Sequence, residues 1–312
     1  MDPLAALLDG PRARGAFLLR SVLTPPWCLR IEDRAPLTLV AVVRGVAWIV
    51  PDDADGVRLG PGDLAVVRGP DPYLVADDPA TPPQAVILPG QECRTPDGEH
   101  LTDLGDVGVR TWGSGSDGPL VMLTGTYPVA GEVSRRLLAA LPPRLVLRAS
   151  DWQSPLVPLL AEEIGRDVPG QEAVLDRLLD LLLIAALRTW FAQSGDRAPA
   201  WYQAHDDPVV GQSLRLMQDQ PDRPWTIAEL AAHSGVSRAA LARRFTAAVG
   251  EPPMSYLAGW RLALAADLLR QQPGSTLGAV ARKVGYGSSF ALSSAFKREY
   301  GQSPQHYRAS AQ

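Results

Sequence analysis

Side chains at matched positions of two C-terminal segments have the types needed to contact a nucleic acid. Arg243 carries a guanidinium that can donate two hydrogen bonds to O6 and N7 of guanine in the major groove of DNA. Ala239 and Phe290 offer apolar groups that suit the methyl group of thymine, whereas Ser293 and Ser294 are versatile but weak hydrogen-bonding groups. Surface Arg and Lys side chains on most helices are only solvated, so the elements that position these residues decide how they are interpreted.

Those elements form an internal repeat. The residues of the first copy match the second at an offset of 50, and the offset becomes 51 from Ser237 onward, which one extra residue in the second turn explains. A repeat of this kind indicates one supersecondary unit used twice. The matched residues are Ile227, Leu230, Ala231, Gly235, Ser237, Leu241, Phe245, Gly250, Pro253 and Tyr256 in the first copy, and Leu277, Val280, Ala281, Gly285, Ser288, Leu292, Phe296, Gly301, Pro304 and Tyr307 in the second.

Each copy has the sequence pattern of a helix, a turn with glycine, and a second helix. Thr226 can cap the first helix, and Gly235 can adopt the left-handed conformation that ends it. Ser237 can then cap the second helix, whose Leu241 and Phe245 are four residues apart and face the core. This pattern is typical of a helix-turn-helix unit, and two units in register are far more specific than one.

The second helix of each unit then exposes one face to DNA. At about 100° per residue, the side opposite Leu241 and Phe245 defines the base-reading face. Residues near the helix ends and edges, including Arg238, Lys283 and Arg298, suit phosphate contacts. The predicted DNA-binding residues are Ser237, Arg238, Ala239, Ala242, Arg243 and Thr246 in the first unit, and Ser288, Ser289, Phe290, Ser293, Ser294 and Lys297 in the second.

Residues 256–270 join the two units and have an amphipathic pattern rich in Ala and Leu. A rigid connecting helix of this length predicts two recognition helices about one turn of DNA apart, on one face of the duplex.

Residues from about 207 to 312 resemble the DNA-binding domain of the AraC/XylS family of bacterial regulators. The resemblance implies promoter binding in adjacent major grooves, with base-reading sites at Ala239, Ala242, Arg243, Phe290, Ser293 and Ser294. Family members often have Arg where this chain has Ser294, so the second unit is expected to bind mainly the DNA backbone. The residues that carry the resemblance are 227–232, 235–237, 241–245, 260–262, 284–286, 296–298, 301–304 and 307–308.

The charge is distributed unequally along the 312-residue chain. Residues 205–312 hold 12 Lys and Arg against 8 Asp and Glu, whereas residues 1–204 hold 18 against 26. The whole-chain net charge of −4 would argue against a polyanionic partner, but the C-terminal excess of +4 permits one. The excess is modest, so the repeat carries more weight than the charge.

The N-terminal part has a different periodicity. Short segments rich in β-branched residues, at 37–43, 46–50, 64–67 and 84–88, alternate with Gly, Pro and Asp over residues 17 to about 127, which predicts an antiparallel barrel or jelly roll. Residues 131–194 have helical periodicity, and the leucines of 171–193 spread over more than one face. Such a helix must bury two faces, either within the chain or against a partner subunit.

Residues 17–127 resemble the cupin-like sensor domains attached to such regulators, chiefly at 59–63, 66–67 and 69–70. A cupin-type enzyme fused to a DNA-binding domain is the alternative, but it needs two or three His ligands for a metal. Residues 1–204 contain only His100, so neither a metal site nor a cofactor is expected and the chain is predicted not to be an enzyme.

The expected architecture is an α+β multidomain protein with an N-terminal cupin-like β-barrel plus helices and an all-α C-terminal domain. The predicted domains are a sensor over 1–130, a helical dimerisation segment over 131–195, a linker over 196–206 and a DNA-binding domain with two helix-turn-helix units over 207–312.

Two hypotheses concern the signal. Strand alternation places Cys28 on the same face as Arg30, and Cys93 precedes Arg94, so a guanidinium would lower the thiol pKa and favour oxidation of either cysteine or of the two as a pair. The alternative, which the sequence favours, is that both cysteines are small buried apolar residues. An organic ligand in the barrel, lined by Trp27, Arg30, Trp48 or Tyr73, is the second hypothesis.

Together these features predict a sequence-specific transcription regulator that binds double-stranded promoter DNA as a homodimer, responds to an effector or oxidant and, if it is an activator, contacts RNA polymerase. No signal peptide and no uncharged apolar run of about 18 residues is found, which predicts a cytoplasmic protein without a membrane partner.

Overall fold

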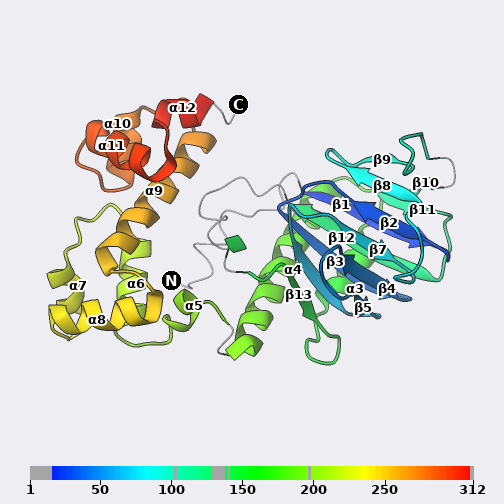
Figure 1. Cartoon of the computed structure of the whole chain (residues 1–312), viewed down its shortest axis with the longest axis horizontal. Helices are drawn as coiled ribbons and strands as arrows, with labels where there is room; N and C mark the ends of the chain where they lie inside the picture. Colours follow the sequence, from blue (N-terminus) through cyan, green and yellow to red (C-terminus); the bar gives the residue numbers. More distant parts are fainter. Residues whose placement is uncertain (1–15, 102–103, 128–137, 140, 196–197, 310–312) are drawn as a thin grey trace. The chain divides into compact units, whose positions relative to one another are not determined.

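The computed structural model describes residues 16–101, 104–127, 138–139, 141–195 and 198–309. They divide into two compact units, one within residues 11–129 and 138–193 and the other within the C-terminal residues from 194 onward (Figure 1). The first is rich in strands and the second is helical, which confirms the predicted α+β fold class.

Two sheets form the β unit. The seven-stranded sheet has the order β10 (Gly105–Gly108), β11 (Thr111–Gly113), β1 (Phe17–Leu23), β12 (Leu120–Tyr127), β3 (Leu37–Arg44), β6 (Leu64–Arg68) and β13 (Arg144–Leu147). The six-stranded sheet has the order β5 (Val57–Leu59), β4 (Ala47–Pro51), β7 (Tyr73–Ala76), β2 (Cys28–Ile31), β8 (Ala85–Leu88) and β9 (Glu92–Arg94). The segments at 37–43, 46–50, 64–67 and 84–88 are strands, as predicted.

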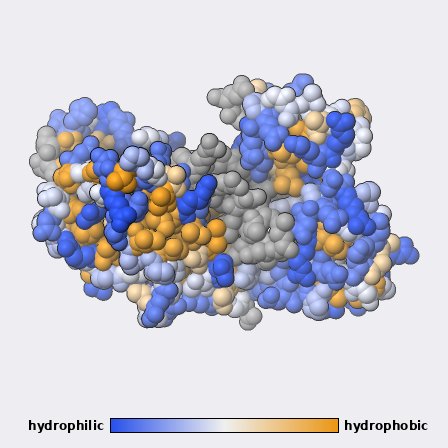
Figure 2. All heavy atoms as spheres, turned by 180° about the vertical axis from the view of Figure 1, so that it is seen from behind, coloured by the Kyte–Doolittle hydropathy of each residue, from blue (hydrophilic) through white to orange (hydrophobic). Residues whose placement is uncertain are grey.

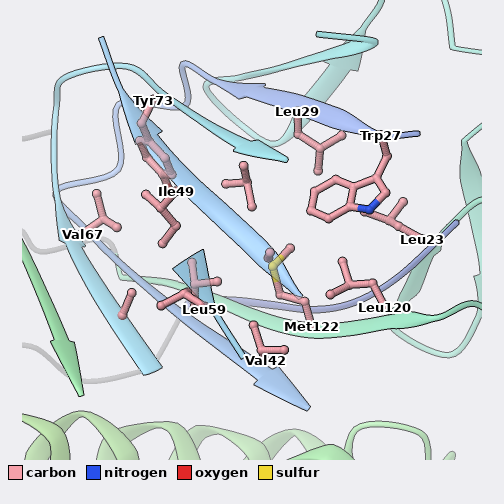
Figure 3. Packing of buried hydrophobic residues seen from close by; sticks show 14 of the residues in the cluster. Leu23, Trp27, Leu29, Val42, Ile49, Leu59, Val67, Tyr73, Leu120 and Met122 are labelled. Atoms are coloured by element: carbon pink, nitrogen blue, oxygen red, sulfur yellow. The ribbon is translucent and has the colours of Figure 1, made fainter. Parts of the chain in front are cut away.

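The core of this unit lies between the two sheets. Alternate residues of each strand point inward, so Val42 of β3, Ile49 of β4 and Met122 of β12 belong to one cluster with Leu23 and Trp27 (Figure 3). Val42 and Ile49 are fully buried. Apolar side chains from the inner faces of both sheets therefore form the core that holds the two layers together.

The turn between β5 and β6 is fixed by Asp63. Its carboxylate accepts hydrogen bonds from the backbone N–H of Gly60 (3.0 Å) and of Ala149 (2.8 Å), and it pairs with Arg148 at 2.9 Å. Burial alone would raise the pKa of Asp63, but these hydrogen bonds and the Arg148 charge lower it below its usual value. The turn between β5 and β6, part of the cupin-like segment, thus holds the residues that follow β13 against the barrel.

Strand β13 corrects one prediction, because residues 144–147 lie in the stretch expected to be helical. Arg-Leu-Val-Leu alternates in burial and pairs antiparallel with β6, so the open edge of that sheet decides its conformation over local helical pattern. Two helices of the same stretch are present, α3 (Leu156–Glu163) and α4 (Gln171–Ser194). No helix among the described residues has the length and apolar character needed to cross a membrane.

Helix α4 packs against the barrel along β12. The hydroxyl of Tyr127 donates a buried hydrogen bond of 2.8 Å to the carbonyl of Leu179. Gly125 allows the close approach, since a Cβ there would lie 2.7 Å from Leu179. The fully buried Leu182 and Leu183 continue this face. One side of the apolar helix is therefore buried within the chain.

The helical unit contains α5 (Ala200–Gln203), α6 (Val210–Asp219), α7 (Ile227–His233), α8 (Arg238–Val249), α9 (Pro253–Gln271), α10 (Leu277–Lys283), α11 (Ser289–Tyr300) and α12 (Pro304–Ala309). It has two cores, one around Leu241 and Phe245 and the other around Leu292 and Phe296. The first half of α9 contributes Leu257 to the first core, and its second half contributes residues to the other.

The stretch expected to be a linker, 196–206, is not simply extended. Its residues 200–203 form α5, which packs against α8, and Ala204 is buried in the first core. Pro199 is the N-cap residue of this helix, a position where its missing N–H removes no helical hydrogen bond. A short helix of the helical unit therefore forms despite the Gly, Pro and polar residues of this stretch. Residues 196–197 lie outside the described part of the chain.

Candidate nucleic-acid interface

The two helix-turn-helix units share the same turn. Gly235 and Gly285 have φ values of +66° and +80°, and in each unit the glycine N–H donates to the helix carbonyl three residues earlier. The following residue in each turn, Val236 or Tyr286, donates to the carbonyl five residues earlier (3.0 and 2.8 Å). The turns span residues 234–237 and 284–288, so the second has the one extra residue that the offset predicts.

The helices that follow these turns begin at serine caps. The Ser237 hydroxyl accepts a hydrogen bond from the N–H of Ala240 (3.2 Å), and Ser288 accepts one from Ala291 (3.1 Å). Thr226 caps α7 in a capping box with Glu229, as its position before the apolar pattern predicts. Local sequence therefore fixes where α8 and α11 start and which way their faces point.

Helix α8 buries Leu241 and Phe245 and exposes the opposite side. Of the six residues predicted there, Ala242 is half-buried and the other five are exposed. Arg243 has no ion-pair partner among the described residues, so its guanidinium is available to an external acceptor. The neighbouring Arg244 differs, because it forms a 2.8 Å ion pair with Asp207.

Helix α11 repeats this arrangement with different side chains. Leu292 and Phe296 are fully buried. Phe290 is 79% exposed, the most exposed large apolar side chain of the described residues. Ser293 is half-buried, and Ser294 and Lys297 are exposed. The geometry brings the predicted residues of each unit onto one exposed face.

The β unit contains a cavity of about 440 Å³ between its sheets. Met122, Thr124 and Thr126, alternate residues of β12, line one wall, and Tyr73 lies on another. Burial keeps the pKa of Tyr73 well above its usual value, so its hydroxyl stays protonated. Alternation along 120–127 is the sequence signal from which the β12 wall could have been found.

The charged group deepest in the lining is already partnered. The Asp33 carboxylate accepts hydrogen bonds from the N–H of Ala35 (3.0 Å) and from the side-chain amide of Gln91 (3.3 Å). Asp106 and Arg110, the other charged lining residues, are exposed. The interior of the cavity is therefore mainly apolar, with hydroxyl and amide groups as its polar contacts.

Comparison with known proteins supports both halves of this description. A family model described as Cupin matches residues 2–192, more than half of the chain, and one described as Helix-turn-helix domain matches residues 230–310. An AraC-like transcription regulator of Streptomyces lividans is 30% identical over 99% of this chain and 98% of its own length. A regulator of the same description from Streptomyces antibioticus is 31% identical with the same coverage. The HTH-type transcriptional regulator AlkR of Acinetobacter baylyi is 26% identical over 99% of both chains.

This chain belongs to the cupin-containing AraC-type transcription regulators. The resemblance drawn from the repeat is thereby confirmed, and so is the expectation of an N-terminal cupin. A helix-turn-helix domain of the AraC type binds double-stranded DNA. The three relatives described above are all transcription regulators rather than enzymes.

Two predictions about cysteines in this regulator are wrong. Burial and the charge of Asp77 raise the thiol pKa of Cys28 to about 11, and they outweigh the charge of Arg30, which lowers it. The Arg30 guanidinium pairs instead with Asp52 and Glu32. Cys93 is half-buried, and burial raises its pKa as well. Both thiols are therefore mainly protonated near neutral pH, in contrast to the lowered pKa expected from the neighbouring arginines.

The strand register also argues against a Cys28–Cys93 disulfide. Cys93 pairs with Ile87 of β8, and Ile87 pairs with Ile31, three residues along β2 from Cys28. Strand spacing and rise then separate the two Cα atoms by about 14 Å, whereas a disulfide needs less than about 7 Å. Cys28 and Cys93 cannot pair without a rearrangement of the sheet.

The residues predicted to line a ligand site are only partly in the right place. Tyr73 lines the cavity, but Trp27, Arg30 and Trp48 do not; Cys93, which belongs to the oxidation hypothesis, lines it as well. Trp27 is buried in the core beside the cavity (Figure 3), whereas alternation along β2 and β4 turns Arg30 and Trp48 to the outer face of the sheet. The prediction selected aromatic residues by type, and the strand faces decide their positions.

Proposed function

We propose that this AraC-type regulator inserts α8 and α11 into adjacent major grooves of promoter DNA and that a small organic effector in the cupin cavity controls this binding. The observation that carries the proposal is the pair of capped helices with matched exposed faces in one unit. The C-terminal excess of positive charge supports it, although charge is the weaker argument.

The first unit supplies the main base contact. Arg243 is exposed on the face opposite the buried Leu241 and Phe245, and its fork geometry suits guanine O6 and N7. Arg238, in the first turn of α8, is exposed and suits a phosphate oxygen. Ala239 and Thr246 complete the groove-facing surface.

The second unit supplies shape and backbone contacts. Phe290 offers an apolar surface for a thymine methyl group, and its exposure leaves that surface free of packing within the chain. Ser293 and Ser294 form only weak hydrogen bonds to bases, and Lys297 suits phosphate. We therefore propose that base specificity is concentrated in α8.

The effector is a compact and mostly apolar molecule. A volume of about 440 Å³ falls in the range of small-molecule sites, and Leu19, Ile87 and Met122 provide an apolar lining. Tyr73 and Thr124 offer hydroxyls to a polar group on such a molecule. Neither metal chemistry nor thiol oxidation is needed for this form of sensing.

We further propose that the regulator is a homodimer assembled through α4. The face of α4 that does not pack on the barrel exposes Val174 and Leu181, and Leu159 of α3 is also exposed. Figure 2 shows apolar side chains gathered on one face of the β unit. A second copy of the chain would bury such a surface.

Footprinting of the full-length protein on the DNA upstream of its own gene tests DNA recognition. We expect two protected half-sites about one helical turn apart. Arg243→Ala should abolish the preference for guanine at one position, whereas Arg166→Ala, which changes an exposed arginine in the segment after α3, should leave the footprint intact. Equal footprints for wild type and Arg243→Ala would reject the assigned role of α8.

Filling the cavity tests sensing. Compounds that raise the Tm of the full-length protein would be compared for wild type and Thr124→Trp, which places an indole in the cavity. The variant should bind DNA normally but lose both the compound-induced stabilisation and the change in DNA occupancy. A Thr124→Trp variant that responds like wild type would reject the cavity as the effector site.

A further inference from the structure

Arg261 lies in the middle of α9, between the two halves of the helical unit. Its Nε donates a hydrogen bond of 2.6 Å to the carbonyl of Pro221, and its Nη2 donates one of 2.7 Å to the carbonyl of Arg223. Both carbonyls belong to the loop between α6 and α7 of the first unit. A single side chain thus fastens α9 to the first unit at the point where α9 passes from one core to the other.

The second turn packs on the same loop. A Cβ at Gly285 would lie 2.7 Å from the carbonyl oxygen of Pro221, 2.8 Å from Nη2 of Arg261 and 2.9 Å from the Cα of Asp222. Gly235 holds the equivalent place in the first turn, also at positive φ, and a Cβ there would meet no atom within 4 Å. Gly285 is therefore required by packing between the units as well as by its own turn.

The guanidinium suits this place for a physical reason. Desolvation lowers the pKa of Arg261, while the nearby Tyr286 and Asp222 raise it, so the charged group sits in a partly dry junction between the units. A planar fork can donate to two carbonyls at once, whereas a lysine ammonium acts as a point charge. The loop itself is held by Trp225, whose Nε1 donates to the carbonyl of Gln220 at 3.0 Å and whose ring lies 3.9 Å from the Arg223 guanidinium.

We propose that Arg261 is a positioning residue that locks the second helix-turn-helix unit against the first and thereby sets the half-site spacing that the regulator accepts. The 19-residue α9 fixes the axial distance between the units, but a helix alone leaves their rotation about its axis to side-chain packing. Arg261 and the close contact at Gly285 restrain that rotation. The inference rests on the proposed function, in which both α8 and α11 enter the grooves.

The test uses full-length protein and DNA selected by the wild type from a random duplex library. Three duplexes are compared: the selected one, the same duplex with one base pair inserted between the half-sites, and a duplex that keeps only the first half-site. One inserted base pair shifts the second half-site by about 3.4 Å and about a tenth of a turn.

For wild type we expect the insertion to lower affinity about ten-fold or more, because a rigid pair of helices cannot follow it. Arg261→Ala should bind the selected duplex about ten-fold more weakly than the wild type does. The inserted base pair should lower the affinity of this variant by less than about three-fold further. The variant should bind the single half-site with wild-type affinity. Arg261→Lys should behave like Arg261→Ala, because one point charge does not replace the fork.

Gly285→Ala and Gly235→Ala form the matched pair. Both place a Cβ at positive φ, but only the former pushes on Pro221 and Arg261. Gly285→Ala should therefore broaden the accepted spacing, whereas Gly235→Ala should retain a sharp preference even if its overall affinity falls. This pair also provides the readout if Arg261→Ala fails to fold.

Two results would overturn the inference in different ways. A sharp spacing preference in both Arg261→Ala and Gly285→Ala would reject the positioning role of Arg261 while leaving two-groove binding intact. Absence of any spacing preference in the wild-type protein would reject two-groove binding itself, and with it the positioning role of Arg261.

Discussion

The two helix-turn-helix units have the same interior and different exteriors. Gly235 and Gly285 form turns with the same hydrogen bonds, and serine caps start both α8 and α11. On the exposed faces, however, Arg243 corresponds to Ser294, and Arg244 corresponds to the buried Ala295. The residues that fold each unit are thus repeated, while the residues that contact other molecules have diverged. Four experiments test how far this division holds.

The largest effect is expected in the two cores. Phe245→Ala and Phe296→Ala each remove a fully buried ring and should cost about 3–5 kcal/mol of stability. Because the two rings belong to separate clusters, each change should raise amide exchange mainly in its own unit. Hydrogen exchange with mass spectrometry on the full-length protein measures this directly. Equal loss of protection in both units after either change would mean that they unfold as one.

The next largest effect concerns DNA. Arg243→Ala should weaken binding by about 1–3 kcal/mol and relax the preference at one base pair, whereas Ser294→Ala should cost less than about 1 kcal/mol. Titration of a selected duplex and of its single-base variants separates the two outcomes. Ser294→Arg sharpens the comparison, because it should add a guanine preference in the second half-site. A larger loss for Ser294→Ala than for Arg243→Ala would reverse the assignment of specificity.

The sequence predicts the helical unit better than the barrel, because its information is local. Thr226 and Ser237 lie directly before the helices they cap, and Leu241 and Phe245 are one turn apart. The cavity depends instead on strands far apart in sequence: β1 pairs with β11 and β12, and β12 pairs with β3. No short-range pattern reveals those neighbours.

Errors in the barrel have the same origin. Arg30 lies on the same face of β2 as Cys28, yet its guanidinium pairs with Asp52, which follows β4, and burial of the thiol outweighs the Arg30 charge. The β13 strand forms only because β6 offers it an edge. In the helical unit the contact between Arg261 and the 221–223 loop was likewise beyond prediction, since the partners are about 40 residues apart and are carbonyl groups, which have no sequence signature.

The serine caps should contribute equally to the two units. Ser237→Ala and Ser288→Ala each remove a hydroxyl that accepts one backbone N–H, at a cost of about 1 kcal/mol. Exchange rates of the first-turn amides of α8 and α11 report on each cap separately. Ser237→Asp and Ser288→Asp should restore protection, because a carboxylate also caps a helix N-terminus. Unequal costs would show that contacts outside the repeat support one of the helices.

The smallest effect should come from the ion pair between Asp207 and Arg244, because the matched position of the second unit holds Ala295. Asp207 accepts hydrogen bonds from the N–H groups of Val209 (2.8 Å) and Val210 (2.9 Å) and pairs with Arg244 at 2.8 Å. Burial would raise the pKa of Asp207, but these hydrogen bonds and the Arg244 charge lower it below its usual value. Since the folded-state pKa is the lower one, the stabilisation is present above the unfolded pKa of about 4 and is lost as the pH falls through the folded value.

Arg244→Ala makes the first unit match the second, which has Ala295 at that position. Both partners are partly exposed to solvent, so the loss should stay below about 1 kcal/mol near neutral pH and shrink further at high salt. Asp207→Asn should cost more than Arg244→Ala, because it also weakens the cap of α6. Exchange protection of α6 and α8 between pH 7 and pH 3 distinguishes the two: the difference between wild type and Arg244→Ala should shrink toward the acid end, as the pH approaches the lowered pKa of Asp207. If it persisted undiminished there, Arg244 would stabilise the first unit by packing of its aliphatic stem rather than by its charge.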